Sequence, residues 1–220
     1  MKKILLTALA FSCVLSVFAQ KIKVNEADEK IGNGTNNALV VSIYGASIKD
    51  IEHEWKSMMK DYGAKVSTKD GVFADNAVIK QMGNNTVDIY EKSEDKKNGE
   101  VKFMVAFDLG GAYLSSSAQS DKYKIAEKIV HDFAVKMTRE AIEEQLKQQQ
   151  KALNKLNDQQ KDLVHDNDKM NKDIKNYQDK IKNDQDALVK NKADQEKKQQ
   201  EINGQQKVVD DVNKKAKAVE

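Results

Sequence analysis

The chain contains no proline, and its single cysteine, Cys13, lies near the N-terminus. The segment around that cysteine has the layout of a secretory signal: Lys2 and Lys3 come first, an apolar run follows over residues 4–18, and Ala19 ends it. Cleavage before Gln20, at the end of a signal spanning 1–19, would leave a chain without cysteine. Disulfides are then excluded even in an oxidising compartment, and the fold has to be stabilised by packing.

Two alternatives for the N-terminal segment stay open. The first is an uncleaved membrane anchor, although residues 4–19 are only 16 long and a spanning helix needs about 20 apolar residues. The second is lipidation at Cys13, although Ala10, Phe11 and Ser12 precede it in place of the usual leucine-led motif. Cleavage predicts a mature chain that has no transmembrane segment.

An excess of charge of either sign is also missing. The sequence has 37 basic and 35 acidic residues, and loss of Lys2 and Lys3 would reduce the basic total to 35. A mature chain with no net charge is not expected to bind nucleic acid, which requires a basic surface, or an anionic membrane surface. The signal and the composition rich in lysine and asparagine predict export to the periplasm or cell envelope of a bacterium, or secretion.

Aromatic residues are scarce, at 6% against 33% charged, which would suggest disorder if both were spread evenly. Instead the aromatic residues concentrate before residue 135 and the charged ones after residue 140. The chain is therefore predicted to have two parts. Before them, residues 20–37 are polar and contain glycine, and we expect a flexible leader there.

Residues 38–141 are predicted to form a small α+β domain with a mixed β-sheet and one packed helix. A buried strand at 38–44 precedes a helix that Ser47 can cap, with Asp50 three residues later, and that Gly63 ends. Apolar alternation in the segment 101–107 is typical of an inner strand. The other strands are expected at 64–67, 71–79 and 86–92.

A second helix is predicted to start near Ser120. Its apolar stripe is wide up to Met137, which is typical of a helix packed on a sheet, and narrows from Ile142 onward. The change in width places the domain boundary at residues 141 and 142. Residues 142–220 are then predicted to project as a coiled-coil segment.

The coiled-coil prediction rests on a 4-3 spacing that continues from Ile142 to Val219. A stripe this narrow is covered by another helix, so self-association is the expected consequence. Asn167 occupies a core position where a polar residue favours a parallel dimer. The predicted interface consists of Leu146, Leu153, Leu156, Leu163, Asn167, Met170, Ile174, Tyr177, Ile181, Leu188, Ile202, Val209 and Val212.

The sequence leaves open whether this segment is one continuous helix or a helical hairpin. At every second core position from Asp184 to Gln205, four residues in a row are polar: Asp184, Asn191, Lys198 and Gln205. A bend near 182–186 would give two arms of similar length. Against the bend, no proline or glycine lies at that point, and the spacing continues across it. Gly204 is a second candidate for a break.

No motif predicts chemistry. His53, His131 and His165 belong to three separate helices without metal-ligand spacing, so no metal site is expected. The acidic residues Asp50, Glu52 and Glu54 are expected on an exposed helix face, with no second carboxylate placed opposite them by spacing. The loop at 108–117 precedes a helix start but lacks the glycine pattern of a phosphate-binding loop. No catalytic residue, cofactor or metal is predicted.

These observations predict a non-enzymatic secreted or envelope protein. Its coiled coil would oligomerise or act as a spacer, and its sheet domain would bind an envelope protein partner. A sheet body with a helical arm resembles in outline the periplasmic holdase chaperones with helical tentacles, although their arms are inserted within the β body and here the arm follows it. The alternative is therefore a chaperone-like holdase, and a third hypothesis is an enzyme with a site in the 108–117 loop.

Overall fold

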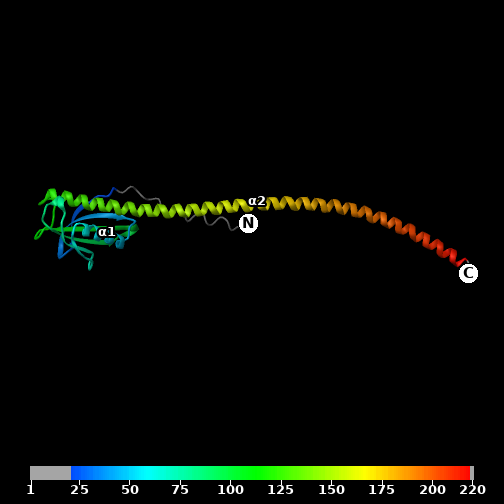
Figure 1. Cartoon of the computed structure of the whole chain (residues 1–220), viewed down its shortest axis with the longest axis horizontal. Coiled ribbons are helices and arrows are strands. Elements are labelled where there is room, and N and C mark those ends of the chain that lie inside the picture. The colour runs from blue at the N-terminus through cyan, green and yellow to red at the C-terminus, as the bar shows by residue number, and fades with distance from the viewer. Residues whose placement is uncertain (1–20, 219–220) are drawn as a thin grey trace. The chain divides into compact units, whose positions relative to one another are not determined.

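The computed structural model describes residues 21–218 and has an α+β fold, with a six-stranded sheet, one small helix and a long C-terminal helix (Figure 1). The predicted signal at 1–19, with Cys13, lies outside the described residues, as does Val219. The elements in chain order are β1 (Asn25–Ile31), β2 (Gly34–Tyr44), α1 (Ile48–Asp61), β3 (Lys65–Ser67), β4 (Val72–Ala77), a 3-10 turn (Lys80–Met82), β5 (Val87–Asp95), a second 3-10 turn (Lys97–Gly99), β6 (Glu100–Asp108) and α2 (Ser120–Lys217).

The strands are ordered β1-β2-β6-β5-β4-β3, and every neighbouring pair is antiparallel. The α+β class is confirmed. The prediction of a mixed sheet is wrong, because the sheet is antiparallel throughout. The strand β6 lies inside the sheet between β2 and β5, as its alternation indicated. Its residues Phe103, Val105 and Phe107 face the main core, and Met104 and Ala106 are buried in a second cluster.

Residues 20–37 do not form the flexible leader that we expected, because strand β1 and the first residues of β2 lie within them. The two strands form a hairpin in which Ile31 pairs with Gly34, and Gly32 has a φ of 68° in the turn. A two-residue turn that starts with glycine is a common hairpin connection. The charged residues of β1 obscure this hairpin in the sequence. Such residues suit an edge strand because they discourage pairing with other chains.

The hairpin is held to the sheet by an apolar contact. The side chain of Ile31 is 5% exposed and packs with Ala38, Met104 and Ala106. Tyr90 and Tyr113 lie beside this cluster, so β1 helps to cover a second small core.

Helix α1 is capped as predicted, with the Asp50 N–H donating to the hydroxyl of Ser47 at 3.2 Å. Its buried face places Trp55 against Phe103 of β6 and Phe133 of α2, with ring centroids 5.0 and 4.9 Å apart and rings tilted by 75° and 76°. Trp55 Nε1 is buried without a conventional hydrogen-bond partner. Edge-to-face aromatic packing is a stable arrangement for such rings, and this cluster joins both helices to the sheet.

Helix α2 is continuous from Ser120 to Lys217, which decides against the hairpin alternative (Figure 1). Its first part packs on the sheet through Tyr123, Ala126, Val130, Phe133, Ala134 and Met137. All described residues from Glu143 onward are exposed, so burial ends at the predicted boundary.

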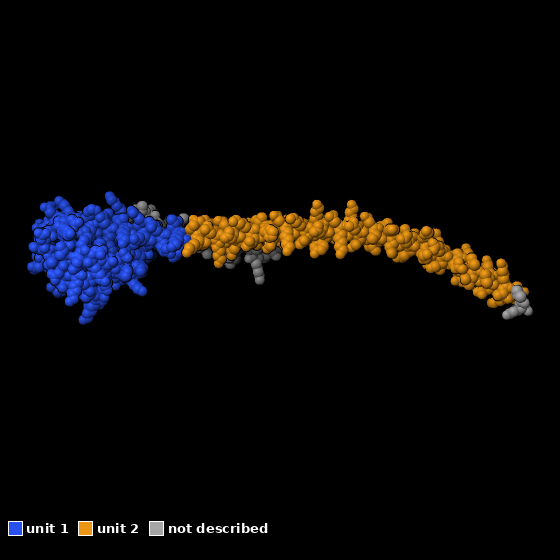
Figure 2. Space-filling view, in the orientation of Figure 1, with its two compact units in different colours: residues 1–149 blue, residues 150–220 orange. Residues whose placement is uncertain are grey.

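The chain divides into two compact units, one ending at Gln149 and one beginning at Gln150 (Figure 2). The division falls a few residues after the boundary predicted from the stripe. A reason is that Gln145 still approaches the end of β2, since a Cβ added to Gly45 would lie 3.0 Å from its Nε2 atom. Within residues 21–218, we find no helix with the length and apolar character needed to cross a membrane.

The structure of β1 generates a stability prediction. We expect Ile31→Ala to lower the free energy of unfolding by roughly 2–4 kcal/mol, because it leaves a cavity in the second core. Asp28→Ala, at an exposed position of the same strand, is the control and should change stability by less than about 0.5 kcal/mol. Urea unfolding measures the free energy of unfolding of both variants. An unchanged value for Ile31→Ala would contradict the packing of β1 and favour the flexible leader.

Candidate functional site

The predicted coiled-coil residues form one exposed apolar stripe on α2. The apolar members of the predicted interface, from Leu146 to Val212, are between 43% and 66% exposed. Among the large hydrophobic residues exposed in the described part of the tail, only Val164, Val189 and Val208 lie off the stripe. So many aligned and exposed apolar side chains make the stripe a candidate interaction surface.

The polar contacts of the tail are local. The Asn171 side-chain amide donates to Asn167 Oδ1 at 2.9 Å, Lys161 pairs with Asp158 at 3.5 Å, and Lys198 pairs with Glu201 at 2.5 Å. Each joins residues three or four apart, as expected on one helix face. The hydrogen bonds and ion pairs described for the side chains of residues 150–218 all have this spacing.

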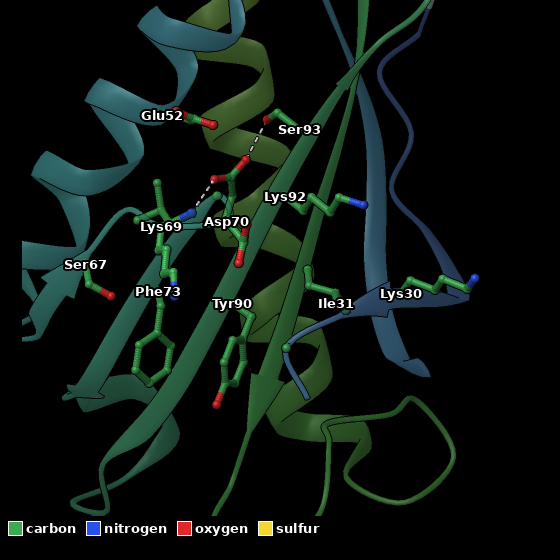
Figure 3. Close-up of a pocket in the computed structure, with 14 residues that line it drawn as sticks. Lys30, Ile31, Glu52, Ser67, Lys69, Asp70, Phe73, Tyr90, Lys92 and Ser93 are labelled. Atoms are coloured by element: carbon green, nitrogen blue, oxygen red, sulfur yellow. Dashed lines mark hydrogen bonds between the residues drawn. The ribbon is translucent and has the colours of Figure 1, made fainter. Parts of the chain in front are cut away.

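A second candidate site is a cavity of about 600 Å³ around the carboxylate of Glu91 on β5 (Figure 3). Its wall includes Glu52 from α1, Lys69 and Asp70 from the turn before β4, and Tyr90. Glu91 is 1% exposed, and it is the one buried charged residue in the described part of the chain. A carboxylate at such a position normally requires a cation or hydrogen bonds.

Hydrogen bonds hold the Glu91 carboxylate in place. Its Oε1 accepts from the Ser93 hydroxyl at 2.5 Å, and its Oε2 accepts from the Val72 N–H at 3.2 Å. No ion pair within residues 21–218 includes Glu91. The pKa of Glu91 is raised to about 7, chiefly by burial of the carboxylate. The hydrogen bond from Ser93 opposes this shift, the negative charge of Glu52 adds to it, and the hydrogen bond from the Val72 N–H opposes it.

The backbone around this carboxylate is tightly packed. Gly71, in the turn before β4, has a φ of 89°, and a Cβ there would lie 2.1 Å from the carbonyl oxygen of Glu91. Only glycine fits such an approach. The turn therefore brings the Val72 N–H within reach of the Glu91 carboxylate.

Sequence reasoning missed Glu91, although one signal could have found it. Val87 and Ile89 point toward the core, and the two-residue period of a strand places Glu91 on the same face. The strand predicted at 86–92 rests on the alternation of Val87 and Ile89 alone. Continuing that phase would have predicted a buried carboxylate.

The structure separates the three acidic residues of α1. Asp50 accepts a hydrogen bond from the Ser47 hydroxyl at 2.6 Å, and Glu54 pairs with Lys136 of α2 at 2.8 Å. Glu52 alone faces the cavity that holds Glu91. A second carboxylate is thus near Glu52 after all, placed there by tertiary structure and not by spacing within the helix.

The histidines are not gathered into a metal centre. His53 lies on α1, whereas His131 and His165 lie far apart on the single helix α2. The prediction of three separate helices is therefore wrong. No group of three or more His, Cys, Asp or Glu side chains in the stretch 21–218 is arranged to hold a metal ion.

The loop at 108–117 uses its polar groups within the fold. Asp108 Oδ1 accepts from the N–H groups of Gly110 and Gly111 at 2.9 and 3.1 Å. The Ser116 N–H and hydroxyl both donate to the Glu26 carboxylate, at 2.9 and 2.5 Å, and these bonds lower the pKa of Glu26 although its partial burial acts in the opposite direction. The loop thereby connects the end of β6 to β1.

The position of Glu91 generates a pH prediction. Its folded-state pKa of about 7 exceeds the ordinary value of 4.5, so the folded protein binds the proton more tightly than the unfolded chain. The stabilisation of the fold by this tighter proton binding is present in full below about pH 4.5. It is lost as the pH rises to about 7, which lowers the free energy of unfolding by at most about 3 kcal/mol. We expect Glu91→Gln to stabilise the protein at pH 8 and to have little effect at pH 4.5.

Urea unfolding of both proteins at pH 4.5, 6 and 8 measures this difference. Glu94→Gln is the control, because Glu94 lies on the same strand but is exposed and paired with Lys92 at 2.9 Å. A difference between the Glu91→Gln variant and the parent that does not change with pH would contradict the prediction.

No protein-family model matches the chain, and no match is found among curated proteins or among solved structures. The proposals below therefore rest on the chain's own residues.

Proposed function

We propose that the protein is a non-enzymatic, exported component of a bacterial cell envelope whose C-terminal helix self-associates as a coiled coil. In this role the helix is an oligomerisation element or spacer, and the sheet module contacts a protein partner. The observation that carries the proposal is the exposed apolar stripe on the part of α2 beyond residue 141.

The width of the stripe indicates what covers it. On the first part of α2, the buried residues Ala126, Val130, Phe133, Ala134 and Met137 form a broad face that a sheet covers. Beyond Ile142 the stripe has one residue every three or four positions. A partner helix fits such a stripe through knobs-into-holes packing, whereas a sheet would leave much of its own surface uncovered.

The polar residues of the tail support the same role. Lys161 and Asp158 form an ion pair between residues three apart on the outside of the helix. Each such pair contributes only a few tenths of a kcal/mol, so these contacts keep the helix soluble and support it weakly. Burial of the stripe is the larger source of stability for a helix of this kind.

Export is proposed on the sequence of residues 1–19 alone. Nucleic acid is not proposed as a partner, since the mature chain would carry no net charge.

The holdase alternative uses the same exposed side chains to hold unfolded proteins. A holdase should suppress aggregation of a denatured client at a stoichiometry set by the tail, and Leu163→Ala would weaken that activity as well. A spacer should show no such suppression. A light-scattering assay with heat-denatured citrate synthase separates these two roles.

Self-association generates the next prediction. Leu163→Ala removes about 1–2 kcal/mol of apolar burial per copy, or about 2–4 kcal/mol per dimer. The dissociation constant from sedimentation equilibrium should therefore rise roughly 30- to 700-fold. Val189→Ala is the matched control, since Val189 is 71% exposed and lies off the stripe.

Two results would contradict the proposal. One is a parent protein that is monomeric at all concentrations up to about 1 mM, where coiled coils with dissociation constants in the micromolar range would be paired. The other is an equal effect of Leu163→Ala and Val189→Ala, which would mean that the stripe does not mediate association.

A further inference from the structure

The core positions between Leu146 and Ile181 contain no charged residue. Eight of these eleven positions are apolar, and the three polar ones are Gln149, Gln160 and Asn167. Each of the three is an amide, which carries both a hydrogen-bond donor and an acceptor. An amide can therefore bond to its own copy, whereas two carboxylates or two lysines cannot do so without a proton or counterion.

We infer that two copies of α2 pair in parallel and in register from Leu146 to Ile181, and that the pairing weakens where Asp184 would face its own copy. The inference rests on the self-association proposed above and adds the orientation, the register and a weak point. In a parallel, in-register pair each core residue faces the same residue of the second copy.

Antiparallel pairing of the same segment would mismatch the amides. When the two helices run in opposite directions and Leu146 lies opposite Tyr177, each core amide faces an apolar side chain of the other copy. Gln149 would face Ile174, Asn167 would face Leu156, and Gln160 would face Leu163. A buried amide without a hydrogen-bonding partner is unfavourable, so this arrangement is disfavoured.

The residues that flank the stripe are compatible with a second copy. In a parallel pair, the residue just before each core position of the series Leu146, Leu153, Gln160, Asn167, Ile174 and Ile181 contacts the residue five positions later on the other helix. Asp166, Asp173 and Lys180 then face Asn171, Gln178 and Gln185. Charges of the same sign are not opposed at these positions, so the flanks do not repel a copy of the same chain.

Beyond Ile181 the pattern changes. Asp184 and Lys198 occupy core positions and would each face their own copy in an in-register pair. Lys198 has a neutralising partner in Glu201 at 2.5 Å, whereas none of the ion pairs in the described chain includes Asp184. Like charges opposed in a core layer are unfavourable, so Asp184 marks the end of the strongly paired part. Leu188 is the one apolar core position between Asp184 and Ile202, and further apolar core positions follow at Val209 and Val212.

Disulfide trapping tests orientation and register. Cys13→Ser is introduced in the full-length chain, followed by Gln149→Cys in one sample and Ile174→Cys in another. In a parallel, in-register dimer, the cysteines introduced at position 149 of the two copies face each other and should form a disulfide in most dimers after mild oxidation. In the antiparallel overlap they would be separated by 25 helical residues, or about 37 Å.

The mixture of the two variants gives the opposite readout. A disulfide between position 149 of one chain and position 174 of the other, found by mass spectrometry of the linked peptides, would overturn the inference. A dimeric sample with neither disulfide would also overturn it, while leaving self-association intact. A monomeric sample in sedimentation equilibrium would instead refute both the self-association and its geometry.

The weak point has its own test. Asp184→Leu replaces the opposed carboxylates by an apolar layer and should lower the dissociation constant at least about tenfold. Asp186→Leu is the matched control, because Asp186 is two residues away on the outer face of the helix and should leave the dissociation constant unchanged within about threefold. Equal effects of the two substitutions would overturn the assignment of Asp184 to the core of an in-register pair.

Discussion

The contact among Trp55, Phe103 and Phe133 is the interaction on which the rest of the structure depends. The three rings come from α1, β6 and α2, and their centroids lie between 4.9 and 5.0 Å apart. Aromatic side chains bury large areas and prefer defined relative orientations. Through this contact both helices are positioned on one sheet, and the start of α2 is anchored to the fold. The tail beyond it is free of the core because its apolar residues are too few and too narrowly placed to pack on a sheet.

One helix therefore has two different roles along its length. The part that packs on the sheet presents a broad apolar face. The tail presents a narrow stripe that no other described residue of the chain covers. Propensity alone does not make a long helix stable in water, and most helical stability in proteins comes from packing of an apolar face. Burial of the stripe against a second helix, as proposed above, would stabilise the tail in this way.

The Glu91 cavity belongs to a different part of the molecule and obeys a different constraint. Burial opposes ionisation of the carboxylate, while hydrogen bonds from Ser93 and Val72 favour it without balancing the cost of desolvation. The close approach of Gly71 to Glu91 shows that the surrounding backbone accommodates this group tightly. Its measurable consequence is a dependence of stability on pH within the sheet module, independent of the tail.

Local patterns in the sequence were sufficient for much of the fold. The Ser47 cap, the end of α1 before Gly63, the inner strand at 101–107 and the start of α2 at Ser120 were all confirmed, because each depends on neighbouring residues. The change in stripe width predicted a boundary at residues 141 and 142, a few residues before the division between the two compact units. The stripe itself could be read from spacing, although its pairing remains a prediction.

Strand β1 and the burial of Glu91 were instead decided by tertiary structure, and the continuity of α2 did not follow from the spacing. The polar residues of β1 form a strand because β2 supplies its hydrogen bonds and the second core accepts Ile31. The polar core positions from Asp184 onward are compatible with both a bend and a continuous helix. The structure shows that α2 is continuous. Glu91 is buried because β4 and α1 cover it, and Glu52 approaches it from an element about forty residues earlier in the chain. The sequence by itself determined the local caps, periods and the narrow stripe, whereas contacts between distant segments decided which polar residues are buried, because such contacts leave no local pattern.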